Sequence, residues 1–173
     1  MTVKKFLIIF GCVMAVVLAI ALSVPQQEQD NTMTFYYARS QFAYGVPDGV
    51  IGSEQRDVGG HERDVDYLLA LYLEGPLDTS LTSPFPRKTV TRILSVTQQT
   101  GLLNIQLSDL SNAMTDSQFS LACACLTKTS LALPGVHAVQ ITSGNRSVRM
   151  NHANVHFYDE SSSVKIPQTE EEK

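Results

Sequence analysis

The chain has 173 residues with 17 acidic and 13 basic side chains, so its formal net charge is −4. No cluster of Lys and Arg interrupts this balance, which argues against a nucleic-acid partner. Between an apolar first segment and a polar last one, the length leaves room for one domain with a single hydrophobic core.

The first segment has the pattern of a membrane anchor. Lys4 and Lys5 precede an uncharged apolar run from Phe6 to Val24, and a helix of about 20 apolar residues crosses a bilayer. The lysines favour a cytoplasmic N-terminus by the positive-inside rule. We therefore expect residues 1–24 to be a single-pass signal anchor in the cytoplasmic membrane. The chain after Pro25 would then lie on the extracytoplasmic side.

Two other fates of this segment stay open. Ala19-Ile20-Ala21 and Ala21-Leu22-Ser23 both place small residues at the spacing of a signal-peptidase site. Lipidation of Cys12 is disfavoured, because Phe10 is bulky for that motif and the apolar run continues well beyond the cysteine.

Polar segments flank the expected domain. Residues 25–33 lack hydrophobic periodicity and predict a linker. Residues 159–173 contain three consecutive serines and three consecutive glutamates, a composition typical of a solvated, flexible tail. The folded domain is therefore expected over residues 34–158.

The domain begins with strand signals. The aromatic-rich MTFYYAR, Met33 to Arg39, predicts a first strand. Turn residues from Gly45 to Gly49 follow, and Val50 to Val58 predicts a short extended segment.

An amphipathic helix is expected next, in the stretch ERDVDYLLALYLEGP that starts at Glu62. Its apolar residues recur at i, i+3, i+4 and i+7, which places them on one helical face; they are Val65, Leu68, Leu69 and Tyr72. Gly75 and Pro76 predict the end of this helix.

Two alternating segments predict an antiparallel hairpin around Gln98 to Gly101. Apolar and polar residues alternate over most of each segment, so the apolar side chains should share one buried face. These are Val90, Leu94 and Val96 in the first segment, and Leu103, Ile105 and Leu107 in the second.

A second helix is predicted after the hairpin. Thr115 and Gln118 have the spacing of a capping box, and Pro134-Gly135 predicts the end of the helix. The expected apolar face consists of Phe119, Ala122, Cys123 and Leu126. Val136 to Thr142 then predicts a strand, and a last strand is expected near Val148.

The predicted order is strand, helix, two strands, helix, strand. This order is typical of an α+β domain in which two helices cover one face of a mixed sheet. We therefore expect that fold, preceded by the N-terminal transmembrane helix.

Several sequence features between Thr34 and Met150 occur in a characteristic order. They are the FYY of the first strand, the helix that closes in Leu73-Glu74-Gly75-Pro76, a proline-containing loop before a strand, the hairpin strand from Gly101-Leu102 to Leu107-Ser108, and the helix Thr115 to Leu133 followed by Pro134-Gly135-Val136. This set resembles the GerMN domain family of sporulation, spore-germination and related envelope proteins. The chain departs from the best-known members in having one copy rather than two, and in a long segment from Ser40 to Gly49.

The resemblance implies a non-enzymatic envelope module, with no catalytic, cofactor-binding or metal-binding residue to carry over. We expect a membrane-anchored extracytoplasmic module that binds protein in a cell-envelope assembly of sporulation or germination. Its expected partners are envelope or sporulation-complex proteins, or further copies of itself.

Two alternatives remain. One is a sensory module that recognises a wall fragment or a germinant, which a deep pocket among Tyr36, Tyr44, Tyr67 and Tyr72 would favour. The other is a small wall-active enzyme, which would need a polar cleft with paired titratable groups.

The histidines do not form a recognisable metal motif. His61 and Glu62 resemble the start of H-E-x-x-H, but Val65 stands where the second histidine is required. His152 and His156 share a face without a carboxylate or cysteine to complete a ligand set. We expect structural roles for these side chains and a position in the sheet for His137.

The two helical cysteines are expected to be structural. Cys123 and Cys125 are two residues apart, so they point about 200° apart around a helix and cannot jointly bind a metal. Cys123 is expected in the core and Cys125 at its edge. Gly59-Gly60 is too short for a phosphate-binding loop.

Overall fold

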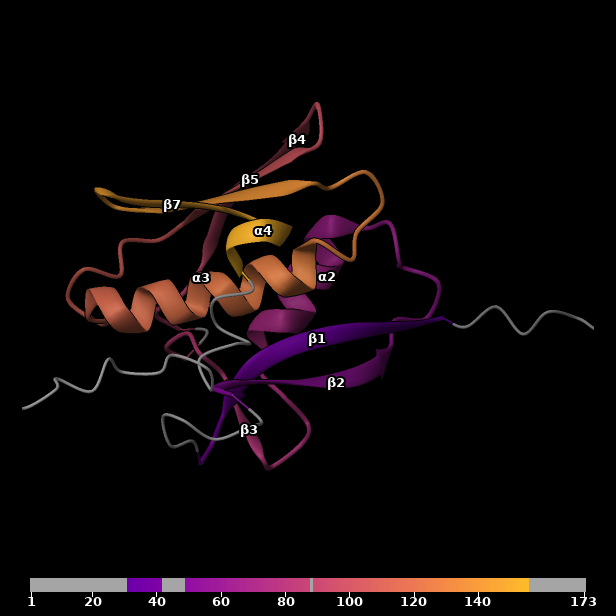
Figure 1. Cartoon of the computed structure of the whole chain (residues 1–173), viewed down its shortest axis with the longest axis horizontal. Helices are drawn as coiled ribbons and strands as arrows, with labels where there is room; N and C mark the ends of the chain where they lie inside the picture. The colour runs from indigo at the N-terminus through magenta and orange to yellow at the C-terminus, as the bar shows by residue number, and fades with distance from the viewer. Residues whose placement is uncertain (1–30, 42–48, 88, 156–173) are drawn as a thin grey trace, which may run out of the picture. The chain divides into compact units, whose positions relative to one another are not determined.

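The computed structural model describes residues 31–41, 49–87 and 89–155. Contacts divide the chain into residues 1–30 and 31–173, and the elements below belong to the second unit (Figure 1). They are β1 (Thr32–Arg39), β2 (Ile51–Asp57), α2 (Val65–Leu73), β3 (Leu81–Thr82), β4 (Ile93–Gln99), β5 (Leu102–Leu107), α3 (Asp116–Ser130), β6 (Ala138–Ser143), β7 (Arg146–Asn151) and α4 (His152–Val155).

The strands form two sheets rather than one. A three-stranded antiparallel sheet has the order β2-β1-β3, and a four-stranded sheet has the order β4-β5-β6-β7. In the second sheet β5 and β6 are parallel and the other pairs are antiparallel. The α+β class and a mixed sheet are therefore confirmed. The expectation of one sheet that includes the first strand is wrong, because β1 pairs with β2 and β3.

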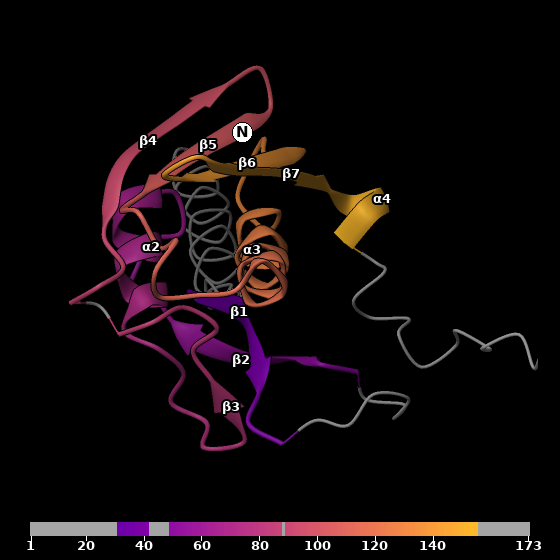
Figure 2. The ribbon, with the colours of Figure 1, turned by 90° about the vertical axis from the view of Figure 1, so that its left-hand side faces the viewer.

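The two long helices lie between the sheets. Figure 2 shows β4 to β7 on one side of α2 and α3, and β1 to β3 on the other. Helix α3 contacts β1 on one side and β6 and β7 on the other. A helix between two sheets must be apolar around most of its circumference. Nine of the 15 residues of α3 are buried, including Thr127, Thr129 and Ser130. The expected packing of two helices on one face of a mixed sheet therefore holds for β4 to β7, but the prediction did not include the second sheet that covers the other side of the helices.

Helix α2 agrees with the sequence expectation. Asp64 caps its N-terminus by accepting a hydrogen bond from the backbone N–H of Tyr67 at 3.1 Å. Leu68, Leu69 and Tyr72 are buried, and Val65 packs against the core. After the helix the chain adopts a left-handed conformation at Gly75, with φ 92°, which a residue without a side chain adopts at little cost.

The capping box of α3 is also confirmed. The Thr115 hydroxyl oxygen accepts from the backbone N–H of Gln118 at 3.3 Å, and the Gln118 side chain accepts from the backbone N–H of Thr115 at 2.9 Å. The helix ends at Ser130, with Leu131 as its C-cap.

The hairpin forms as predicted, but the phase of its first strand changes. Ile93 pairs with Leu107, and the next pair is Ser95 with Gln106, so Leu94 lies in a β-bulge. A bulge inserts one extra residue and shifts the alternation of side chains. Leu94 is therefore 56% exposed and Val90 45% exposed, whereas Thr91 is fully buried. The expected burial of Leu94 is wrong because of this bulge, and that of Val90 is wrong because Val90 lies in a turn before β4, where its backbone N–H donates to the Arg87 carbonyl oxygen at 2.8 Å.

The core joins the aromatic residues of β1 to α2. Tyr37 and Tyr72 stack with ring centroids 4.8 Å apart and planes 7° apart, and Phe85 meets Tyr72 edge-on at 6.4 Å. Burial of rings of this size contributes a large share of a small domain's hydrophobic stabilisation.

The expected anchor lies outside the described residues. The same holds for Cys12, for the possible cleavage sites between residues 19 and 23, and for the tail 159–173. Among the helices within 31–41, 49–87 and 89–155, none has the length and apolarity needed to span a membrane.

Candidate functional site

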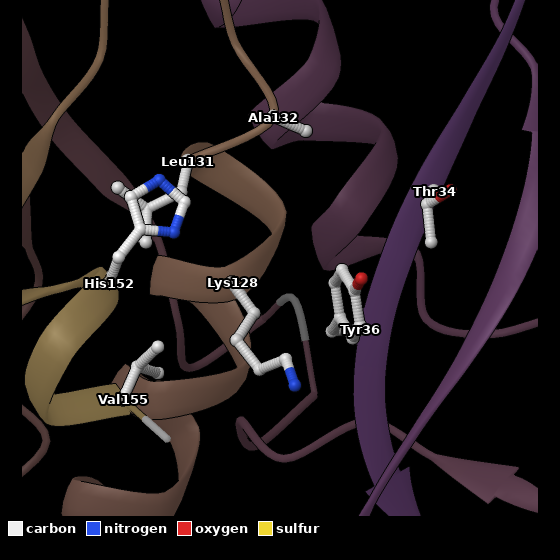
Figure 3. A pocket seen from close by; sticks show the side chains of 7 residues that line it. All are labelled: Thr34, Tyr36, Lys128, Leu131, Ala132, His152 and Val155. Carbon is white, nitrogen blue, oxygen red and sulfur yellow. The ribbon is translucent and has the colours of Figure 1, made fainter. Parts of the chain in front are cut away.

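A groove lies between β1 and the C-terminal part of α3. Its volume is about 340 Å³, and α4 closes one side of it (Figure 3). The described residues that line it are Thr34, Tyr36, Lys128, Leu131, Ala132, His152 and Val155.

Strand β1 forms one wall of this groove because a helix approaches its edge there. The backbone N–H of Tyr36 donates to Thr129 Oγ1 on α3 at 2.9 Å. The same hydroxyl donates to the carbonyl oxygen of Cys125, one turn earlier, at 3.1 Å. Thr129 is 2% exposed, so this bond joins strand to helix away from water.

The groove combines apolar walls with the cationic side chain of Lys128. The Lys128 ammonium lies 4.7 Å from the centroid of the Tyr36 ring, a cation–π arrangement. His152 begins α4 on the opposite wall. None of the lining residues in the described part of the chain is acidic. The groove is therefore chemically suited to bind an extended, partly apolar and acidic segment.

A second exposed feature is the outer edge of β4. This strand is at the end of its sheet and pairs only with β5 among the described strands. Its sequence, ILSVTQQ, has no charged residue and no proline. The neighbouring outer face is also neutral and polar, with Thr97 opposite Asn104 and Gln106 opposite Thr142.

His61 lies near the start of α2 and contacts neighbouring side chains. Its Nδ1 is 3.6 Å from Asp64 Oδ2, and its ring stacks on Tyr67 with centroids 4.2 Å apart. No group of three or more metal-ligating side chains gathers in the ranges that the structure describes.

The other described histidines, His137 and His152, lie elsewhere in the chain, and His137 comes just before β6 rather than within the sheet. The backbone N–H of His137 donates to the Gly101 carbonyl oxygen at 2.8 Å, which attaches the segment before β6 to the hairpin turn. His152 is in the groove wall, and His156 lies outside the described residues.

Both helical cysteines are free thiols in the core. Burial raises the pKa of Cys123 to about 12, although the charge of Arg146 acts in the opposite direction. A thiol with such a pKa is protonated at neutral pH and is a poor nucleophile. Cys125 is fully buried. Its expected position at the core edge is wrong, because α3 has a sheet on each side.

The tyrosines considered for a common pocket do not gather there. Tyr72 is in the core, Tyr67 stacks on His61, and Tyr36 lines the groove. Tyr44 lies outside the described residues. The three described rings therefore occupy three different environments.

Sequence reasoning missed the groove residues on the helix. Lys128 and Thr129 belong to the polar stretch TKTS, which directly follows the apolar residues LACACL of the same helix. Polar residues at the end of an apolar helical stretch were the one sequence feature that pointed to these positions. Their proximity to β1 depends on packing between segments 93 residues apart, which local periodicity does not contain.

Three chains of solved structures are similar to this one, and they include the following two. A crystal structure of a lipoprotein candidate from Clostridium perfringens has 17% identity, covers 70% of this chain and 87% of that chain, and has a TM-score of 0.42. The tandem GerMN domains of the sporulation protein GerM from Bacillus subtilis have 13% identity, with 72% of this chain and 43% of that chain covered and a TM-score of 0.43. No curated protein matches the sequence.

The sequence profile of one family matches residues 34–149. The description of that family is sporulation and spore germination, and it names no enzymatic reaction. The match covers most of the domain, including both long helices and all seven strands apart from the ends of β1 and β7. This chain belongs to the Germane family of sporulation and spore germination domains.

Proposed function

We propose that the protein is a membrane-anchored, extracytoplasmic module that binds protein partners in a cell-envelope assembly of sporulation or spore germination. Membership of the Germane family supports the process. The apolar run from Phe6 to Val24 supports the anchor.

The open edge of β4 is the observation that best supports a role in binding a protein partner. The tight turn at Thr100 and Gly101, with φ of 49° and 80°, makes Gln99 and Leu102 a hydrogen-bonded pair. Bonding alternates along an antiparallel pair, so the backbone groups of Val96 and Gln98 point away from β5. Sheet edges are usually protected by charges or proline, and this strand has neither. Its edge can therefore accept a strand from a partner.

Exposed apolar surface at the same edge supports this role. Leu94, displaced outward by the bulge, is 56% exposed at the start of the strand. A tether to the membrane would raise the effective concentration of such a surface near membrane-bound partners, so that weak contacts suffice for assembly.

The test uses crosslinking of the full chain in membranes of the producing cells. Leu94→Lys places a charge at the proposed interface and should reduce the crosslinked partner several-fold, by opposing edge pairing. Leu77→Lys is the matched control, because Leu77 is 75% exposed but lies outside β4. Equal crosslinking of both variants would contradict the proposal that β4 forms part of the interface.

A genetic experiment addresses the process. Deletion of the gene should impair spore formation or germination and leave vegetative growth normal. An enzymatic role would replace this proposal if the purified protein hydrolysed wall material and lost that activity on substitution of one carboxylate or histidine.

A further inference from the structure

The β4–β5 hairpin carries no charged side chain. The chain has 17 acidic and 13 basic residues, yet no acidic residue, basic residue or histidine occurs from Ile93 to Ser108. Figure 2 shows β4 at the border of its sheet, with β5, β6 and β7 all on the same side of it. The outer edge of β4 is therefore a neutral strand edge, which another strand can approach without meeting a charge.

The pairing with β5 decides which backbone groups point outward. Gln99 and Leu102 form a hydrogen-bonded pair across the turn, and bonding alternates along the strand. Val96 and Gln98 therefore direct both N–H and C=O away from β5. An antiparallel copy of the same strand uses all of these groups when Val96 of each copy lies opposite Gln98 of the other. Each of these pairs then exchanges both of its hydrogen bonds, and the two-fold axis passes near Thr97.

The absence of charge favours a second copy over a different protein. In a two-fold symmetric interface the same surface meets itself, so a charge near the axis would face its own like charge. A different partner usually presents charges that complement those of its target, and Ile93 to Ser108 offers none to complement. In a chain with a net charge of −4, this hairpin is a surface on which two copies can meet without repulsion between nearby charges.

We propose that the partner strand at this edge is β4 of a second copy of this chain, paired antiparallel around Thr97. Two four-stranded sheets would then join into one continuous sheet. This inference rests on the proposed function, because it names the partner of the strand edge to which that function is assigned.

The side chains on the outer face of β4 suit this register. Ser95, Thr97 and Gln99 are exposed. The register places Ser95 opposite Gln99 of the other copy and the two Thr97 side chains opposite each other, so that hydroxyl and amide groups can form hydrogen bonds across the pairs. The nearest charged residue in the sequence is Arg92. Its two copies would be roughly 30 Å apart along the paired strands, a separation at which salt screens their repulsion.

The size of the contact sets the strength of the dimer. One pair of strands is a small interface, so the dimer should be weak in dilute solution. The proposed anchor would confine both copies to one membrane and raise their effective concentration there. The dimer is therefore expected in membranes, where it should be measured.

Cysteine crosslinking of the full chain in membranes of the producing cells tests the register. The background variant is Cys12→Ser, because Cys123 and Cys125 are buried and should not react. Thr97→Cys should give a covalent dimer on mild oxidation, because the Cα atoms of opposed residues in a non-hydrogen-bonded pair are about 4.5 Å apart, within disulfide reach. Ser95→Cys, on the same face of the same strand, should give roughly fivefold less dimer or lower, since its two copies would be about 14 Å apart.

A double variant completes the register test. Ser95→Cys combined with Gln99→Cys introduces cysteines at positions that oppose each other between copies, so it should form as much dimer as Thr97→Cys. Dimer formation in Thr97→Cys that does not exceed that of Ser95→Cys alone would overturn the proposal. A double variant that forms no more dimer than Ser95→Cys would also overturn it.

Backbone pairing is tested separately in the Thr97→Cys chain. Gln98→Pro removes an N–H that points away from β5, a position at which an edge strand tolerates proline, and it should lower dimer formation several-fold. Gln98→Ser keeps this N–H and loses the same side-chain bond to the Pro134 carbonyl oxygen, so it should crosslink normally. Circular dichroism verifies that both variants are folded, and equal crosslinking of the two would contradict backbone pairing.

This inference and the proposed function fail in different ways. If Leu94→Lys reduces crosslinking to another envelope protein while Thr97→Cys gives no dimer, the edge binds a different partner and only the second-copy inference is overturned. If Leu94→Lys and Leu77→Lys crosslink equally to every partner, the binding role of the β4 edge is overturned as well.

Discussion

The guanidinium of Arg56 on β2 donates from Nη1 to the carbonyl oxygen of Gly75, just beyond the end of α2, at 3.2 Å. The same nitrogen donates to the Leu71 carbonyl oxygen at 3.2 Å, and Nε lies 3.5 Å from Glu54 Oε1. Arg56 is 8% exposed. It thus provides a donor for the Gly75 carbonyl group beyond the helix end and a second donor for the Leu71 carbonyl group, which also accepts from the backbone N–H of Glu74 at 3.2 Å.

Replacement of this arginine should destabilise the domain strongly. Arg56→Leu removes the side-chain donor of the Gly75 and Leu71 carbonyl groups and the cationic partner of the Glu54 carboxylate, which should lower the free energy of unfolding by about 2–4 kcal/mol. Arg63→Leu, the same change at an exposed position, should alter it by less than about 0.5 kcal/mol. Denaturant unfolding of both variants measures the difference, and similar midpoints would contradict the assigned role.

Leu69 should not tolerate a charge. It is 3% exposed on the buried face of α2, so Leu69→Asp places a carboxylate in the core and should unfold the domain. Leu77→Asp makes the same chemical change at a position that is 75% exposed and should leave the melting temperature almost unchanged. Circular dichroism melting distinguishes the two, and equal melting temperatures would show that the face of α2 is assigned wrongly.

The capping box of α3 gives a smaller, well-defined effect. Thr115→Ala removes the acceptor of the Gln118 N–H and should cost about 1 kcal/mol of stability. Thr115→Ser keeps a hydroxyl at the same place and should cost much less. If thermal unfolding gave equal losses for both variants, the methyl group rather than the cap would be responsible.

Alkaline pH should destabilise the protein through its buried tyrosines. Burial raises the pKa of Tyr37 to about 12 and the pKa of Tyr72 well above its usual value. The unfolded chain releases these protons near pH 10, so the contribution of the two tyrosines to folding stability is complete below that pH and falls as the pH rises toward 12. The loss should be up to about 1.4 kcal/mol per pH unit for each tyrosine.

Tyr72→Phe is the matched variant for this pH effect. The Tyr72 hydroxyl finds no hydrogen-bond partner among the described residues, so its removal should cost little at pH 7 and should make the alkaline loss shallower. Denaturant unfolding from pH 8 to pH 11.5 measures both slopes. An unchanged slope in Tyr72→Phe would exclude this tyrosine as a source of the effect.

The proposed anchor makes a prediction about fractionation. The full chain should stay with membranes after a high-salt wash and leave them only in detergent, because salt screens charges but not a hydrophobic span. Recovery of a soluble form that begins near Leu22 or Val24 would demonstrate cleavage and contradict the anchor.

Local sequence determined both long helices of this protein. The Asp64 cap, the spacing of Leu68, Leu69 and Tyr72, and the left-handed Gly75 act within a few residues of one another, as does the capping box of Thr115. Interactions over such short separations are visible in the sequence, and for that reason the helix positions and most strands were predicted correctly.

Tertiary packing decided how these elements are arranged. The sequence pattern of β1 predicts a strand but not its partners, and its pairing with β2 and β3 created a second sheet. Because of that second sheet, Cys125 is buried rather than at the core edge. For the same reason Arg56, which stands in the polar sequence SEQRD, is a buried residue. The groove has the same origin: it exists because Thr129 of α3 meets Tyr36 of β1 across 93 residues of chain. Contacts at such separations depend on which surfaces bury the most apolar area together, and no local periodicity specifies that choice.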